Sequence, residues 1–340
     1  MIDRLRLTLQ WSLMLSALLC VVVIVAVGVG PVPIAPMTTV AVLGSLIGVV
    51  DPAPLAPSAL LIIAEIRLPR VLLAGLVGIA LATAGAVMQG FFRNPLADPS
   101  IIGVSSGAAV GAVAVIVLGV SLPGGLGLQT AAFSSAVATG FVVYLIARRG
   151  GRTPVATLLL AGVAVQAFLG ALISFMTLLS GWDMRRVLYW LMGHLGGTTW
   201  DDLSVIAVVV PLLLIATYLH AHALNVLTLG ESSAQAVGIA VERTKQRLLI
   251  LASVLTAVAV AVTGVIGFVG LIVPHGMRLV VGADHRILLP TSALAGASFL
   301  IIADAIARSA AAELPVGIVT AAVGAPFFLY LLRREGAVEL

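Results

Sequence analysis

Charged residues are scarce in this sequence. Only 9% of its 340 residues are charged and 61% are hydrophobic, whereas soluble domains average about 25% charged and about 45–50% apolar residues. The apolar residues come in blocks of about 20, the length that crosses the hydrocarbon core of a bilayer. We therefore expect residues 1–340 to form a single transmembrane domain in contact with lipid, and we expect no nucleic-acid partner.

Cysteine and lysine are each present once. With Cys20 as the only cysteine, neither an intrachain disulfide nor a metal site built on several thiolates can form. Lys245 lies in VERTKQ with no glycine-rich turn before it, so the chain lacks the loop that holds the phosphates of ATP in ATPases. We expect no catalytic residue, cofactor or metal site here, and any ATP and Mg to be used by partner subunits.

Ionisable residues are almost missing from the apolar blocks, although a carrier driven by an ion gradient needs such residues as relays. Asp304 is one of the few exceptions, and it precedes Arg308 by four residues. That spacing favours a local helix ion pair over a proton relay. A gradient-driven secondary carrier therefore stays open only as a more distant alternative to a transporter powered by another subunit.

The apolar blocks predict an all-α polytopic protein with about ten transmembrane helices. Glycines near residue 265 predict a tight turn on the outer side, and the segments 38–50 and 187–198 predict short outer helices because they are too short or too polar to cross. The ten blocks are 11–30, 70–91, 101–119, 128–147, 155–179, 203–219, 247–266, 267–281, 287–306 and 316–332.

Basic residues orient this model, because Lys and Arg are retained on the cytoplasmic side. An even number of spans places both termini on one side. If that side is the cytoplasm, five of the 18 basic residues lie outside, namely Arg67, Arg70, Arg185, Arg186 and Arg308. The remaining 13 lie inside, which supports two cytoplasmic termini.

Small residues recur every four positions along two of the blocks. Helices in lipid associate through close backbone approach, for which small side chains are needed. We expect these positions to pack helix against helix: Ala74, Gly78, Ala82, Ala86, Gly90, Gly103, Gly107 and Gly111.

The longest inner loop contains a candidate docking element. The stretch ESSAQAV has an acidic residue in its first turn, Glu231, and is followed by Gly238 where a helix terminator belongs. It predicts a short helix on the inner surface. The residues alone favour a solvated loop helix over a docking helix.

Four segments resemble one known family. RLPR (67–70), GAVMQGFFRNPLADPSIIGVSSGAA (85–109), GFVGLIVPHGMRLVVGADHR (267–286) and ELPVGIVTAAVGAPFF (313–328) are similar to the permeases of iron-chelate, haem and cobalamin ABC importers. The resemblance implies a homodimer of ten-helix permeases in a bacterial inner membrane. It also implies two cytoplasmic ATP-binding subunits and a periplasmic substrate-binding protein.

The same resemblance assigns residues to contacts with these partners. Coupling to the ATPase is implied for Leu229, Gly230, Glu231, Ser232, Ser233, Ala234, Gln235, Ala236, Val237 and Gly238. Docking of the binding protein is implied for Arg67, Arg70 and Arg308. Exposed guanidinium groups suit that task because each grips a carboxylate through two hydrogen bonds, although anchoring of helix ends remains open as another role.

The translocation pathway and the cargo are the remaining inferences. In similar permeases the fifth and tenth spans line the pathway, which points here to Gln166, Ser174, Phe175 and Met176. The five histidines form no haem or metal constellation, so we expect the binding protein to select the cargo. The segment VPHGMRLVVGADHRILLP looks most like the haem branch, so haem is the first expectation, with a ferric siderophore or cobalamin as alternatives.

Overall fold

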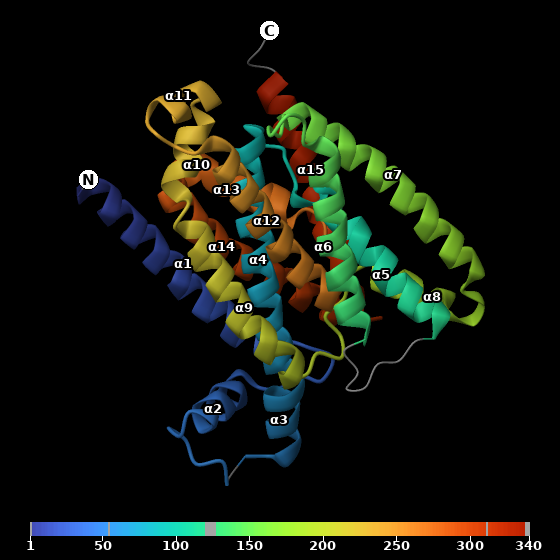
Figure 1. The fold of residues 1–340 in the computed structure, drawn as a ribbon. Coiled ribbons are helices and arrows are strands. Elements are labelled where there is room, and N and C mark those ends of the chain that lie inside the picture. The colour runs from blue at the N-terminus through green and yellow to red at the C-terminus, as the bar shows by residue number, and fades with distance from the viewer. Residues whose placement is uncertain (1, 54, 120–126, 311, 337–340) are drawn as a thin grey trace.

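The computed structural model describes residues 2–53, 55–119, 127–310 and 312–336. Helices make up almost all of the described chain (Figure 1). The α-helices are α1 (Ile2–Gly28), α2 (Pro36–Leu46), α3 (Pro57–Leu61), α4 (Leu68–Phe92), α5 (Val104–Leu118), α6 (Gly127–Ala147), α7 (Val155–Leu179), α8 (Met184–Leu191), α9 (Trp200–Tyr218), α10 (Ala221–Thr228), α11 (Glu231–Ala236), α12 (Val241–Thr263), α13 (Val269–Val281), α14 (His285–Ser309) and α15 (Val316–Gly336). Three short helical turns are η1 (Ile62–Arg67), η2 (Pro99–Ile102) and η3 (Gly181–Asp183).

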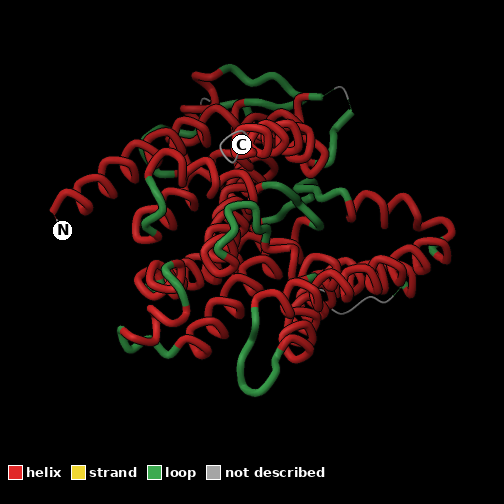
Figure 2. The backbone as a smooth tube through the Cα atoms, turned by 90° about the horizontal axis from the view of Figure 1, so that it is seen from above, coloured by secondary structure: helices red, strands yellow, loops and turns green. Residues whose placement is uncertain are grey.

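Helix α4 runs through the centre of the bundle, and α1 and α7 lie at its edge (Figure 1). The view from above shows the amino-terminal end at the rim of the molecule (Figure 2). α4 packs against α14, α12, α13 and α9. In the most apolar stretch of the helical segment Pro57–Phe92, which ends in α4, 83% of the residues are buried. The corresponding stretches of α1 and α7 are each 17% buried. The peripheral helices therefore leave most of their apolar side chains uncovered by this chain.

Close backbone contact explains the small residues of α4. A β-carbon at Gly85 would lie 1.8 Å from the carbonyl oxygen of Gly270 on α13, and one at Gly78 would lie 2.2 Å from that of Gly296 on α14. No side chain fits in such gaps, so only glycine permits these helices to approach. The predicted packing role is confirmed at Gly78, while Gly85 lies outside the predicted stripe of every fourth residue.

Each of the ten apolar blocks coincides with a helix. Within the described residues, seven helical segments are long and apolar enough to cross a membrane: Arg6–Gly28, Pro57–Phe92, Gly127–Ala147, Val155–Leu179, Trp200–Tyr218, Val241–Thr263 and His285–Ser309. α5, α13 and α15 are shorter apolar helices within the same bundle. The chain is thus an all-α polytopic membrane protein, and the count of ten spans remains a prediction.

The short elements also fall where the sequence places them, with shifted bounds. α12 ends at Thr263, Gly264 adopts a φ of 72° and α13 begins at Val269, which confirms the turn near residue 265. α2 and α3 project from one end of the bundle, and α11 lies at the other, toward which both termini point (Figure 1). We call these the outer and inner ends, following the predicted orientation.

Candidate docking and coupling sites at the two ends of the bundle

The outer site begins with Arg67, the last residue of η1. A π-helical turn is rare and is often found at functional positions, and here it joins α3 to α4 and delivers Arg67 toward α1. The Arg67 guanidinium donates to the carbonyl oxygens of Val27 at 3.1 Å and Gly28 at 2.8 Å, and to that of Val32. Arg67 therefore binds the end of α1.

Arg308, near the end of α14, reaches the same helix end. Its guanidinium donates to the carbonyl oxygens of Ala26 at 3.2 Å and Val29 at 3.4 Å. The last carbonyls of a helix lack partners within the helix and carry partial negative charge. Arg67 and Arg308 together cap the carboxyl end of α1.

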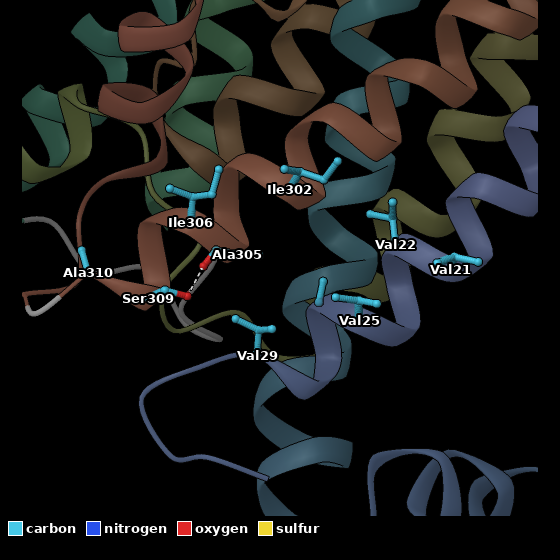
Figure 3. Close-up of a pocket in the computed structure, with 10 residues that line it drawn as sticks. Val21, Val22, Val25, Val29, Ile302, Ala305, Ile306, Ser309 and Ala310 are labelled. Carbon is cyan, nitrogen blue, oxygen red and sulfur yellow. Dashed lines mark hydrogen bonds between the residues drawn. The ribbon is translucent and has the colours of Figure 1, made fainter. Parts of the chain in front are cut away.

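An apolar groove runs beside these caps, between α1 and α14 (Figure 3). Its volume is about 570 Å³, and aliphatic side chains such as Val25 and Ile306 line it. The Ser309 hydroxyl at its edge donates to the Ala305 carbonyl rather than into the groove. The groove is lined almost entirely by apolar side chains, so it has few groups that would hydrogen-bond a polar ligand.

Asp304 links the two sides of the outer site. Its carboxylate is fully buried and lies between Arg70 of α4 and Arg308 of its own helix. Arg70 donates through Nε at 2.9 Å and Nη2 at 2.8 Å, and Arg308 Nε lies 2.9 Å from Oδ2. The predicted ion pair between Asp304 and Arg308 is confirmed, with Arg70 as an additional partner.

Arg70 also holds Glu313, in the loop between α14 and α15. Its Nη1 donates to Glu313 Oε1, and 44% of the Glu313 side chain is exposed. Tyr189 and His194 stack nearby with ring centroids 4.7 Å apart. Burial lowers the pKa of His194, while burial and then the Glu313 charge raise the pKa of Tyr189.

These contacts correct the picture of three exposed arginines. Arg67 and Arg308 are each 4% exposed, and the Arg70 side chain is 11% exposed. The expectation of free guanidinium groups is wrong because backbone carbonyls and two carboxylates of this chain occupy them. Among the three, Arg70 has the partner that is easiest to replace, since Glu313 is partly exposed.

The inner site is built around α11. Ala234 is fully buried beneath the helix, whereas Leu229 and Val237 at its two ends are 75% and 67% exposed. Gly230 precedes the helix with a φ of 126° and Gly238 follows it with a φ of 82°. The predicted short inner helix is confirmed, and it presents apolar ends to the inner side.

Lys245 ties α11 to the bundle. Its side chain is 5% exposed, and Nζ donates to Glu231 Oε1 of α11 at 3.0 Å and to Glu242 Oε1 of α12 at 3.3 Å. Nζ also donates to the carbonyl oxygen of Thr153 at 2.5 Å, while the Thr153 amide donates to Glu242 Oε2 at 3.0 Å. We call Lys245, Glu231, Glu242 and Thr153 the inner cluster.

The comparison that decides the family covers nearly the whole chain. Residues 18–334 match the model of the FecCD transport family. The chain belongs to this family.

Relatives in the FecCD family carry two kinds of name. The cobalamin import system permease protein BtuC of Halobacterium salinarum is 56% identical over 276 residues, which cover 81% of this chain and 74% of the relative. The hemin transport system permease protein HmuU of Yersinia pestis is 46% identical over 277 residues, covering 80% and 83%. This chain is therefore an ABC importer permease.

A solved structure supports the same fold. A metal-chelate type ABC transporter in an inward-facing conformation superposes with a TM-score of 0.83 at 33% identity, covering 95% of this chain and 98% of the other. The FecCD fold thus extends over almost all of the residues, including the peripheral helices α1 and α7.

The four pathway residues of this FecCD chain divide between two faces of α7. Gln166 Nε2 donates to the Ile101 carbonyl at 2.6 Å, and Met176 packs against the core. Ser174 is exposed and Phe175 is 59% exposed. Only Ser174 and Phe175 lie on the uncovered face, so the structure does not bring the four together.

The sequence reasoning did not identify the inner cluster. Glu242 precedes Lys245 by three residues, a spacing that favours a helix ion pair, so this part could have been found. Glu231 and Thr153 could not, because they lie 14 and 92 residues from Lys245.

Proposed function

We propose that this chain is the membrane-spanning subunit of an importer that moves a macrocyclic metal complex from the periplasm to the cytoplasm of a bacterium. Cobalamin is the first candidate cargo, and the 56% identity to a cobalamin permease carries this choice. Haem is the second, supported by the 46% identity to a hemin permease. Both are large metal chelates that require a wide passage.

The passage is proposed to form between two copies of the chain. α7 exposes large apolar side chains along its length, among them Leu160 at 71%, Phe168 at 69% and Leu178 at 76%. A second copy would cover part of this surface, and lipid the rest. An apolar lining offers few polar groups that would fix the cargo in one orientation.

Energy is proposed to come from two separate ATP-binding subunits at the inner end. Helix α11 is the proposed contact, because Leu229 and Val237 give it exposed apolar ends while Ala234 packs it against the bundle. Movement of the ATPase would then press on α11. The residues proposed for this contact are 229–238.

Cargo delivery is proposed to use a periplasmic binding protein with an acidic surface. A carboxylate from that protein would replace Glu313 on Arg70, because Glu313 is the partly exposed partner while Asp304 is fully buried. Arg67 and Arg308 would join the contact only by leaving the end of α1.

Transport in sealed proteoliposomes tests the proposal. The chain is reconstituted with its ATPase subunits and binding protein, and uptake of radiolabelled cyanocobalamin and of haem is measured in parallel. We expect ATP-dependent accumulation of one of them that persists with an uncoupler. Uptake that is abolished by the uncoupler and indifferent to ATP would instead establish a secondary carrier.

A further inference from the structure

Lys245 occupies an unusual place for a basic residue at the inner end of a membrane protein. The two arginines of α12 at the same end, Arg243 and Arg247, are exposed. Exposure is expected there, because basic residues on the cytoplasmic side of a membrane protein face water. Lys245 is instead 5% exposed and its ammonium is directed inward. A buried ammonium is costly unless it is paired and hydrogen-bonded, so its partners deserve a functional explanation.

Those partners come from three separate parts of the chain. Glu231 is the first residue of α11, Glu242 lies in the first turn of α12, and Thr153 lies two residues before the start of α7. An ammonium has three donors, and the three contacts at 3.0, 3.3 and 2.5 Å use all of them. One side chain therefore joins α11, α12 and the residues that lead into α7.

The connection to α7 is made through the backbone. The carbonyl oxygen of Thr153 accepts from Lys245 and its amide donates to Glu242. Pro154 follows immediately and begins the approach to α7 with φ fixed near −63°. A displacement of Thr153 is therefore passed to the first turn of α7 with little slack.

The connection to α11 is made through a side chain. Glu231 keeps 42% of its side chain exposed, and α11 is a six-residue helix between two glycines with positive φ. Such a helix can shift as a unit because the flanking glycines absorb backbone rotation. Its link to Lys245 determines which part of the bundle follows that shift.

We infer that Lys245 is a positioning residue that transmits movement of α11 to the inner end of α7. The inference rests on the proposed function, in which α11 contacts the ATPase and α7 borders the passage. Lys245 touches neither the ATPase nor the cargo in this scheme. It acts by making α11 and Thr153 move together.

The first test measures coupling in the reconstituted transporter. The variants are Lys245→Met, Lys245→Arg and Glu231→Gln, and the control is Arg247→Met, which removes an exposed charge from the same helix. We expect Lys245→Met and Glu231→Gln to lower the cargo moved per ATP hydrolysed by about fivefold or more, the lower end of ordinary coupling between sites. We expect Lys245→Arg to recover part of the loss and Arg247→Met to match the parent chain.

The second test measures, in the absence of cargo, whether α11 and α7 move together. Spin labels are placed at cysteines introduced for Ser232 on α11 and Ala156 on α7, with Cys20→Ser, and distances are compared with and without ATP in the assembled complex. We expect a narrow separation in the labelled parent chain. With Lys245→Met the distribution should broaden and change with nucleotide, because α11 then moves without α7.

The outcomes separate the two claims. If the parent complex shows no ATP-driven uptake, the proposed function fails, while the label distances still report whether Lys245 joins α11 to α7. If Glu231→Gln and Lys245→Met both keep the parental ratio of cargo to ATP and the parental distances, the inference is overturned. Should Lys245→Met not fold, Glu242→Gln takes its place, because Glu242 binds the same ammonium, keeps 32% of its side chain exposed and lies outside the segment 229–238.

Discussion

The two ends of this permease both carry clusters of opposite charges, and the clusters differ in what they hold. The outer cluster, Arg67, Arg70, Arg308, Asp304 and Glu313, surrounds a fully buried carboxylate and caps a helix end. The inner cluster has two partly exposed carboxylates, at 42% and 32%, around one buried ammonium. The outer cluster therefore fixes long helices, and the inner one ties the six-residue helix α11 to them.

The difference in burial has an energetic consequence. A buried charge that loses its partner keeps the cost of desolvation without the compensating attraction. A partly exposed charge that loses its partner is rehydrated by water. Substitutions in the outer cluster should therefore reduce folding stability, and those in the inner cluster should mainly reduce coupling.

Asp304→Asn should give the largest loss of stability. It removes the charge that Arg70 and Arg308 share, and breaking a buried pair in this way costs about 3–5 kcal/mol. Thermal unfolding of the detergent-solubilised protein, followed by size-exclusion fluorescence, measures the effect. A variant as stable as the parent chain would show that water or lipid headgroups reach this cluster.

Lys245→Met should cost less. It leaves the Thr153 carbonyl without its ammonium donor, a loss of about 1–3 kcal/mol, while Glu231 and Glu242 can turn to water. The same unfolding assay, run beside Arg247→Met, isolates the inner cluster from a general loss of charge. A destabilisation equal to that of Asp304→Asn would mean that the two clusters do not differ as we describe.

Arg67→Lys should have a smaller effect again. Lysine keeps the charge at the carboxyl end of α1, but its single nitrogen cannot span the Val27 and Gly28 carbonyls, which Arg67 binds through Nη1, and the Val32 carbonyl, which it binds through Nη2. A cation at a helix end contributes about 0.3–2 kcal/mol, so a fraction of that should be lost. Hydrogen exchange of the last turn of α1 should rise, and unchanged exchange would contradict the capping role.

Sequence reasoning succeeded where the determinant is local. Each of the ten apolar blocks predicted a helix, the glycines near residue 265 predicted a turn, and the spacing of Asp304 and Arg308 predicted an ion pair. Each of these depends on residues within a single helix or turn. Hydropathy and spacing are sufficient in such cases.

It failed where a side chain binds a distant backbone. Arg308 is bonded to the Val29 carbonyl 279 residues earlier, and Arg67 to the Gly28 carbonyl 39 residues earlier. Every residue has a carbonyl, so no residue type in the sequence marks the acceptor. The sequence therefore cannot distinguish an arginine that caps α1 from an arginine that faces the periplasm.

Glu313→Gln should have the smallest effect on stability and the clearest effect on docking. The Glu313 side chain is 44% exposed, so its pair with Arg70 contributes at most about 1 kcal/mol after solvent screening. Removing its charge frees Arg70 for a carboxylate of the binding protein, and we expect tighter capture in a pull-down with that protein. The matched variant Glu65→Gln, which alters an acidic residue of η1 exposed at the same end, should leave capture unchanged. Weaker capture by Glu313→Gln would show that Glu313 itself takes part in the contact, and that Arg70 serves the fold in the same way as its two neighbours.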